Sequence, residues 1–237
     1  MPNYVSMNLA LIGNEESVKK AVEFVKGENS AFDFNKIVPR PETFDKYDTT
    51  NHPFGEGLVL GELKDRWRPE SEDNPIVTPK LIAEYQNASK EQAEKYGVVG
   101  WYDWDVKYWG TKWNACDVVF DGITEDGARY FLTTAWSAPL PVLKRLSELF
   151  PDLVIDFEYA DEDMGYNTGQ GNFTNGEMYA DFPDGGSDEA MALYFKTNGG
   201  ADLFVRTKDG EWRWADDVDE EDIDEEATEK FFEEIGV

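Results

Sequence analysis

Cysteine and histidine are almost missing from this chain, and their scarcity excludes several kinds of site. Cys116 is the only cysteine, so the chain has no internal disulfide and no thiolate metal cluster of its own. His52 is the only histidine, which excludes zinc sites built on several histidines and leaves one imidazole for acid–base chemistry. We therefore expect no metal and no other cofactor.

Basic residues are also scarce, since 22 Lys and Arg stand against 50 Asp and Glu, for a net charge of −28. Binding to phosphate depends on cationic side chains that displace counterions, so this balance argues against direct binding to nucleic acid or to an anionic membrane. An apolar run long enough to span a bilayer, about 18 residues, is missing as well. We expect a cytoplasmic protein.

The negative charge is concentrated in the last third of the sequence. Residues 151–237 hold 26 Asp and Glu against five Lys and Arg, while residues 1–150 hold 24 acids and 17 bases. An asymmetry of this size is typical of a surface that attracts a basic partner, or of a segment kept soluble by its own repulsion. A nucleic-acid-binding protein is such a partner, because its binding groove is basic.

The densest part is a run of nine acids within eleven positions, which we name the acidic run. Its members are Asp216, Asp217, Asp219, Glu220, Glu221, Asp222, Asp224, Glu225 and Glu226. A solvated tail is the ordinary interpretation of such a run. The sharper hypothesis is a nucleic-acid mimic, because same-side residues of an extended chain repeat at about 6.6 Å, which is comparable to phosphate spacing along a strand.

A second group of acids favours the mimic, because it ends a predicted sheet strand and therefore lies on a rigid scaffold. The group comprises Asp156, Glu158, Asp161, Glu162 and Asp163. Carboxylates that are fixed before binding lose less entropy when a partner arrives. We expect the two groups together to form a partner-binding surface.

Hydrophobic periodicity predicts a strand, a helix and a second strand at the start of the chain. Residues 4–12 alternate apolar side chains toward one side, and residues 15–27 place apolar side chains at helical spacing. Residues 32–38 are strand-like again. Residues 42–79 are polar and rich in Pro and Gly, which indicates loops, and residues 79–96 favour helix.

A similar arrangement follows around a predicted hairpin. Two strands, at residues 113–121 and 128–136, precede a helix that begins near Pro139 and a strand at residues 153–159. Two such units predict an α+β protein, a ferredoxin-like split β-α-β antiparallel sheet with helices on one face. The remaining expected elements are short strands at 178–182, 190–196 and 203–206 and a helix at 226–235.

These elements divide the chain into two predicted parts. Residues 1–175 form the ferredoxin-like domain, with a helical insertion around residues 42–107. Residues 176–237 form an acidic C-terminal extension that either packs on the same sheet or trails from it.

Three separated motifs carry a resemblance to a known family. They are FDFNKIVPRPETF at Phe32 to Phe44, YWGTKWNACDV at Tyr108 to Val118, and FLTTAWSAPLPVLKRLSELFPDL at Phe131 to Leu153. Together with FEYADEDMGYNTGQG at residues 157–171, they make the chain resemble the YubB-like family of plasmid, phage and genomic-island proteins across residues 1–175. The resemblance implies a ferredoxin-like fold and an origin in a mobile element, and it implies no catalytic mechanism.

Four tryptophans, Trp101, Trp104, Trp109 and Trp113, lie within thirteen residues. Stacking sites for bases are usually accompanied by basic residues, whereas Asp103 and Asp105 intervene here, so core packing is the main interpretation. An exposed member would instead suit a protein interface, where aromatic anchors carry much of the binding energy.

Other catalytic and metal-binding patterns are poorly matched. No nucleophile in a strained-turn motif accompanies His52, and Cys116 in its predicted strand is interpreted as a small buried hydrophobe. Residues 161–171 lack the ligand order of a calcium-binding EF-hand, and their glycines lack the context of a dinucleotide-binding loop. We expect a protein that is not an enzyme.

The main functional hypothesis combines the charge asymmetry with the resemblance. It describes a phage or mobile-element accessory protein in the host bacterial cytoplasm, which inhibits a nucleic-acid-binding defence enzyme of the anti-CRISPR or anti-restriction type through its acidic, nucleic-acid-mimicking surface. The alternative is a small-ligand-binding protein or enzyme that uses an aromatic pocket. A third possibility is a virion or assembly component.

Overall fold

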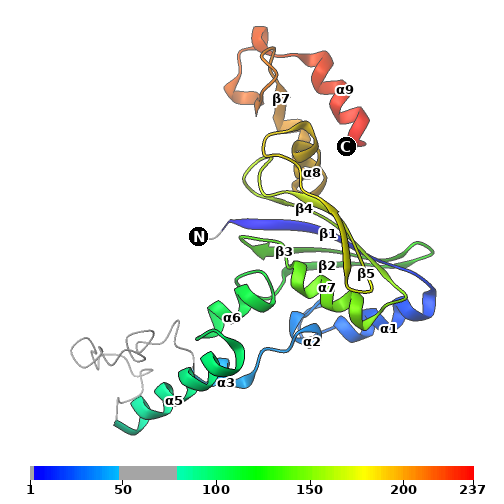
Figure 1. Cartoon of the computed structure of the whole chain (residues 1–237). Helices are drawn as coiled ribbons and strands as arrows, with labels where there is room; N and C mark the ends of the chain where they lie inside the picture. Colours follow the sequence, from blue (N-terminus) through cyan, green and yellow to red (C-terminus); the bar gives the residue numbers. More distant parts are fainter. Residues whose placement is uncertain (1–2, 48–78) are drawn as a thin grey trace.

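A computed structural model describes residues 3–47 and 79–237, and its centre is one antiparallel sheet (Figure 1). The strands are β1 (Tyr4–Ile12), β2 (Cys116–Thr124), β3 (Gly127–Ala135), β4 (Val154–Asp161), β5 (Gly169–Thr174) and β6 (Glu177–Asp181). They lie in the order β2-β3-β1-β4-β5-β6. Helix α1 (Glu15–Val25) follows β1 and helix α7 (Leu140–Leu149) follows β3, so the first four strands and these helices form the ferredoxin-like arrangement.

Strand β1 lies inside the sheet and has the alternation that the sequence predicts. It pairs with β3 on one side and with β4 on the other, both antiparallel. Every second side chain is buried in the main core, namely Val5, Met7, Leu9 and Leu11. This core also receives Val18 from α1 and Leu143 from α7, so both helices cover the same face. We name the other side of the sheet the open face.

The predicted strand at residues 32–38 is wrong. Its centre is the short helix α2 (Phe34–Ile37), because the Asp33 carboxylate accepts a hydrogen bond from the amide of Asn35 and caps a helical turn. Strand β2 therefore supplies the second strand of the first β-α-β unit. The chain between α1 and β2 is an insertion into the ferredoxin-like unit.

The described residues of this insertion form three further helices: α3 (Glu42–Lys46), α5 (Pro79–Tyr96) and α6 (Trp101–Tyr108). Buried Gln92 joins them, because its Nε2 donates to the carbonyl of Thr43 and its Oε1 accepts from the amide of Gly100. The helix expected at residues 79–96 is confirmed. The loops expected at residues 42–79 are wrong at their start, where α3 forms, and residues 48–78, with His52, lie outside the described residues.

The strand expected at residues 190–196 is also wrong, because the segment belongs to helix α8 (Asp188–Asn198). The Ser187 hydroxyl accepts a hydrogen bond from the amide of Ala190 and caps the helix. Buried Met191, Tyr194 and Phe195 recur at helical spacing. Helix α8 lies on the open face, on the opposite side of the sheet from α1 and α7 (Figure 1).

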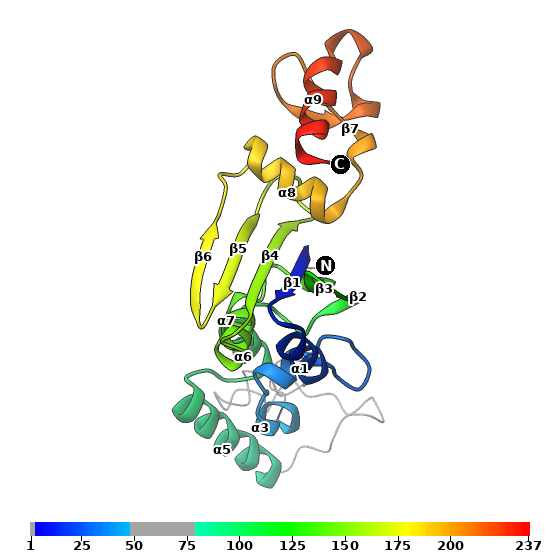
Figure 2. The ribbon, with the colours of Figure 1, turned by 90° about the vertical axis from the view of Figure 1, so that its right-hand side faces the viewer.

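Residues 204–237 form a small acidic lobe that stands on α8, away from the sheet (Figure 2). Its elements are β7 (Phe204–Arg206), β8 (Trp212–Trp214), two 3-10 turns and α9 (Glu225–Ile235). A second core of Ala160, Met191, Phe195, Phe204 and Phe231 joins β4, α8 and the lobe. The acidic extension is thus connected to the sheet through α8.

Candidate functional site

The acidic run is part of the folded lobe. It covers the 3-10 turns Ala215–Asp217 and Glu220–Asp222 and then the first turn of α9. All of its side chains except Asp224 are exposed. The solvated-tail interpretation is therefore wrong, and the carboxylates are spaced by turns and a helix instead of by an extended strand.

Hydrogen bonds fix the acidic run to the β7–β8 hairpin. The amide of Lys208 donates to the carbonyl of Asp222, and the amide of Asp224 donates to the carbonyl of Arg206. The Asp224 side chain accepts from the amide of Ala227 and caps α9. The exposed carboxylates therefore project from a backbone whose conformation is set before a partner binds.

An aromatic core makes the lobe rigid. The ring of Trp212 lies 4.7 Å from Phe231 and 5.4 Å from Phe195 of α8, and Phe204 lies 5.4 Å from Phe195. Ring pairs at these separations contribute about 0.5–1.5 kcal/mol each beyond their burial. The lobe and α8 thus form one packed scaffold for the acidic run.

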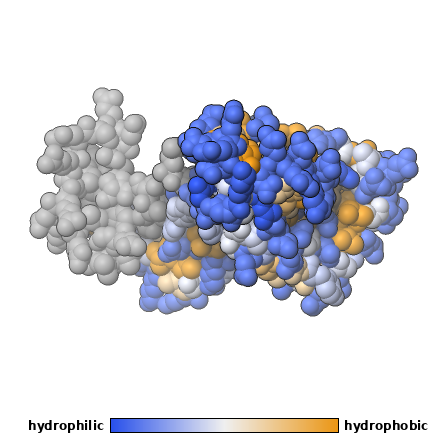
Figure 3. All heavy atoms as spheres, turned by 90° about the horizontal axis from the view of Figure 1, so that it is seen from above, coloured by the Kyte–Doolittle hydropathy of each residue, from blue (hydrophilic) through white to orange (hydrophobic). Residues whose placement is uncertain are grey.

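The basic side chains of the lobe offset little of the charge of the acidic run, although the Lys208 ammonium donates to the carbonyl of Glu221. Arg206 pairs with Asp188 at 3.0 Å, and Arg213 pairs with Glu211 at 2.5 Å. Across residues 3–47 and 79–237, no carboxylate of the run forms an ion pair. The surface seen from above, on the side of the lobe, is mainly hydrophilic (Figure 3). The charge of the run therefore remains available to a partner.

Strand β4 places two predicted site acids, Asp156 and Glu158, on the open face. Asp156 is exposed, and half-buried Glu158 accepts a hydrogen bond of 2.9 Å from Asn8 Nδ2. Partial burial raises the pKa of Asp156, and the negative charge of Glu158 raises it further. The two carboxylates thus repel each other where no cation lies between them.

Asp161 has a different role from the rest of its group. It is buried, and its two oxygens accept hydrogen bonds from Asn3 Nδ2 and Asn167 Nδ2, each at 3.0 Å. The amide of Asp163 also donates to it, at 2.9 Å. Asp161 therefore holds the loop after β4 and is not available to a partner, while Glu162 and Asp163 are exposed beside it.

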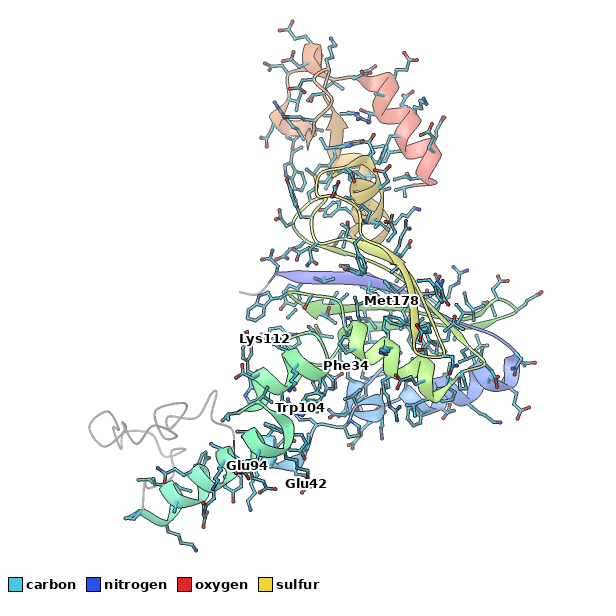
Figure 4. The ribbon with its side chains drawn as sticks, in the orientation of Figure 1. Phe34, Glu42, Glu94, Trp104, Lys112 and Met178 are labelled. Carbon is cyan, nitrogen blue, oxygen red and sulfur yellow. The ribbon has the colours of Figure 1, made fainter. Side chains whose placement is uncertain are left out.

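A pocket of about 430 Å³ lies between the insertion helices and the segment before β2. Its lining combines indole rings with polar groups of both signs: Asn35, Arg40, Phe44, Asp45, Trp101, Asp105, Trp109, Trp113 and Asn114. Trp109 is buried, as the core-packing interpretation expects, whereas Trp101 and Trp113 are half-buried and border the pocket. Buried Trp104 and Phe34 are on α6 and α2, beneath the sheet (Figure 4).

We name this cavity the tryptophan pocket, and Arg40 is the cationic side chain in its lining. Its Nη1 donates to both oxygens of buried Asp105, at 2.8 and 3.1 Å, and its Nη2 lies 2.8 Å from Asp45. Its guanidinium also lies 5.3 Å from the ring centre of Trp109. Burial raises the pKa of Asp105 to about 7, the Arg40 charge opposes that rise, and the charge of Asp45 adds to it.

The sequence did not link Arg40 with Asp105, because the two residues are 65 positions apart. The sole available signal is indirect, since an aspartate within a tryptophan-rich helix needs a partner when it is buried. The pocket therefore depends on tertiary packing.

Neither a metal site nor a membrane-spanning helix is present in the part of the chain that the structure describes. No group of three or more His, Cys, Asp and Glu side chains there is arranged to hold a metal ion. Cys116 is half-buried, and its Sγ lies 3.1 Å from the Thr133 hydroxyl. None of the helices in residues 3–47 and 79–237 has both the length and the apolar character needed to cross a membrane.

A match to a known protein family supports the fold class. Residues 108–202 match the model of a family described as the ferredoxin-like domain in Api92-like protein. The solved structure of protein Api92 from Yersinia pseudotuberculosis is similar with a TM-score of 0.40 and 9% identity, over 78% of this chain and 100% of that one. No curated protein matches the chain. The ferredoxin-like part of the resemblance is confirmed, while the YubB-like name stays an expectation.

Proposed function

We propose that this protein binds a basic protein through its acidic lobe and so competes with nucleic acid for that protein's groove. The partner class is a nucleic-acid-binding defence enzyme of the host, and the site of action is the bacterial cytoplasm. The lobe acts by binding alone, without catalysis. The origin in a mobile element rests on the resemblance, and the acidic binding mode rests on the lobe.

One observation carries the proposal: the acidic run is held on a packed scaffold, and none of its carboxylates forms an ion pair with a described residue. Maintaining so many like charges on one small lobe costs folding free energy through repulsion. A basic groove offsets that cost, because complementary charges attract at long range and speed association. A groove that binds phosphates presents the required Lys and Arg side chains.

The test uses one lobe variant and one control of equal charge. Asp216→Asn, Asp217→Asn, Glu220→Gln and Glu221→Gln together remove four exposed charges from the lobe. The control removes four exposed charges from α1 and the loop after it: Glu15→Gln, Glu16→Gln, Glu23→Gln and Glu28→Gln. Each protein is used to capture partners from host lysate at low salt.

The parent and the control should retain a nucleic-acid-binding protein that the lobe variant loses, and added duplex DNA or RNA should release it. Binding should weaken steeply between low and physiological salt, because several screened charge pairs form together. Equal capture by the lobe variant, or capture that neither salt nor nucleic acid reverses, would contradict the proposal.

The tryptophan pocket supports a second candidate function, the binding of a small planar molecule. The observation that favours it is the cavity of about 430 Å³, which half-buried indoles border. Its volume is within the range of ligand sites, and the indole rings and polar groups of its lining could together orient a bound ring. A rise in melting temperature with a nucleoside or metabolite, lost in Trp113→Ala, would support it, because a ligand selective for the folded state stabilises that state.

A further inference from the structure

The open face is only partly covered by the chain itself. Helix α8 lies over one end of this face. There Asn198 Oδ1 accepts a hydrogen bond from the Ser6 hydroxyl, and Ala160 of β4 packs in the second core with α8. Further along the strands, Asn8 Nδ2 reaches the carbonyl of Lys196, near the end of α8. Ala10 and Asp156, two residues further on, have no helix above them among the described residues.

A groove of about 350 Å³ lies on this uncovered part. Ala10 lies between Arg129 of β3 and Asp156 of β4 in the sheet register, so a small side chain separates two long or charged ones. Asp121 lies with Arg129 on one bank, and Glu158 lies with Asp156 on the other. The floor is therefore small and apolar at Ala10, while both banks carry charge.

The charge balance of the groove favours a cationic occupant. It has three carboxylates and one guanidinium, and Arg129 forms no ion pair with another described residue. A cation between Asp156 and Glu158 would reduce their mutual repulsion. Nucleic acid would add phosphates to this acidic face, so it is a poor occupant.

The same face continues over β5 and β6 as a polar and aromatic surface. In the register of the sheet, Asp156 is followed by Asn172 and then by Tyr179, which is 64% exposed. Tyrosine offers apolar contact area together with a hydroxyl, as protein interfaces require. Aliphatic stems of Lys or Arg can lie over Ala10 while their charged ends reach the banks.

We propose that the open face beside α8 is a docking site for a lysine- and arginine-bearing segment of a protein partner. The inference rests on the proposed function, because it assigns the same basic partner a second contact. The acidic lobe stands on the same side of the sheet (Figures 1 and 2). One basic protein is then held by the lobe and by the sheet, and the Arg129 guanidinium donates to one acidic side chain of the segment, which sets the register of the segment.

The experiment is an NMR titration of the isotope-labelled full chain with a synthetic lysine–alanine peptide that carries about eight positive charges. Amide signals of Asn8, Ala10 and Asp156 should shift with the peptide, in addition to signals of the lobe. The double variant Asp156→Asn/Glu158→Gln should bind at the sheet on the order of tenfold more weakly, since two charge pairs near the surface are lost.

The matched control is Glu23→Gln/Asp152→Asn, which removes the same charge from exposed positions on α1 and after α7. It should retain the sheet-face shifts with the parent's affinity. The four-charge lobe variant should also retain the sheet-face shifts and lose those in the lobe. Both neutral replacements on β4 keep the shapes of the side chains, and the dispersion of the same spectra reports whether the variant is folded.

The outcomes separate this inference from the function on which it rests. Shifts confined to the lobe, or equal weakening at the sheet in the β4 variant and the control, would overturn the sheet site and leave the lobe proposal standing. Shifts at the sheet that persist in the lobe variant would support the docking site independently. Absence of shifts at both surfaces would overturn both proposals.

Discussion

The buried carboxyl of Asp105 should make the protein lose stability as the pH rises from 3.8 to about 7. Burial raises its pKa to about 7, even though Arg40 lowers it in part. A carboxyl with a raised pKa in the folded state binds its proton more tightly there than in the unfolded chain. Its stabilising contribution is therefore complete below pH 3.8 and is lost as the pH passes through about 7.

The magnitude follows from the displacement of the pKa. At about 1.4 kcal/mol for each pKa unit, the full change is on the order of 4 kcal/mol. Part of it has already gone at pH 5, so about 3 kcal/mol remains to be lost between pH 5 and pH 8. This loss belongs to Asp105 alone, and other carboxyl groups add their own dependence.

Comparing the parent with Asp105→Asn removes those other contributions, because both proteins share them. Urea unfolding at pH 5 and pH 8 gives the free energy of unfolding of each protein. The variant should gain about 3 kcal/mol relative to the parent between the two pH values, since asparagine does not titrate. The control is Asp103→Asn, which removes an exposed carboxyl from the same helix. Its free energy of unfolding should differ from that of the parent by the same amount at pH 5 and at pH 8. A difference for Asp105→Asn that does not change with pH would refute the reasoning.

Three other predictions test the packing. Leu143→Ala, in the main core, should cost about 3 kcal/mol in urea unfolding, whereas a loss below about 1 kcal/mol would mean that α7 is loosely packed. Gly127→Ala should destabilise because φ is +125° and a Cβ would lie 2.2 Å from the carbonyl oxygen of Leu11, while Gly210→Ala, with open space around it, should cost less; equal melting temperatures would contradict this. Phe231→Ala should expose the lobe to limited proteolysis before the sheet is cut, and simultaneous cleavage of both would show that the lobe does not open separately.

Local sequence patterns were sufficient to predict the elements whose hydrophobic alternation or boundary residues lie within the element itself. Strand β1, the β2–β3 hairpin and helix α7 lie within a few residues of their predicted ranges. Residues 190–196 fit a strand as well as a helix by their short apolar run, and the Ser187 cap decided between them. The strand predicted at residues 32–38 was wrong for a similar reason, since Asp33 caps a single helical turn there.

The candidate sites were predictable to different degrees. Charge density identified the acidic run, yet its folding depends on contacts of Trp212 with α8 and α9 that no local pattern indicates. The group at the end of β4 was found as a group, but the burial of Asp161 was not, because its partners Asn3 and Asn167 come from other segments. Asp105 required the same kind of long-range information.

The position of β1 inside the sheet has a consequence for how the chain folds. Its neighbours β3 and β4 come from much later in the sequence, and Asn8 bonds to Glu158 across 150 residues. Closing so long a loop must precede the hydrogen bonds of β1 to both neighbours, which makes this pairing slow relative to the local pairing of β2 with β3 and of β4 with β5. During translation, the apolar side chains of β1 therefore leave the ribosome well before β3 or β4 has been synthesised. They stay accessible to chaperones and to aggregation while the insertion is being made.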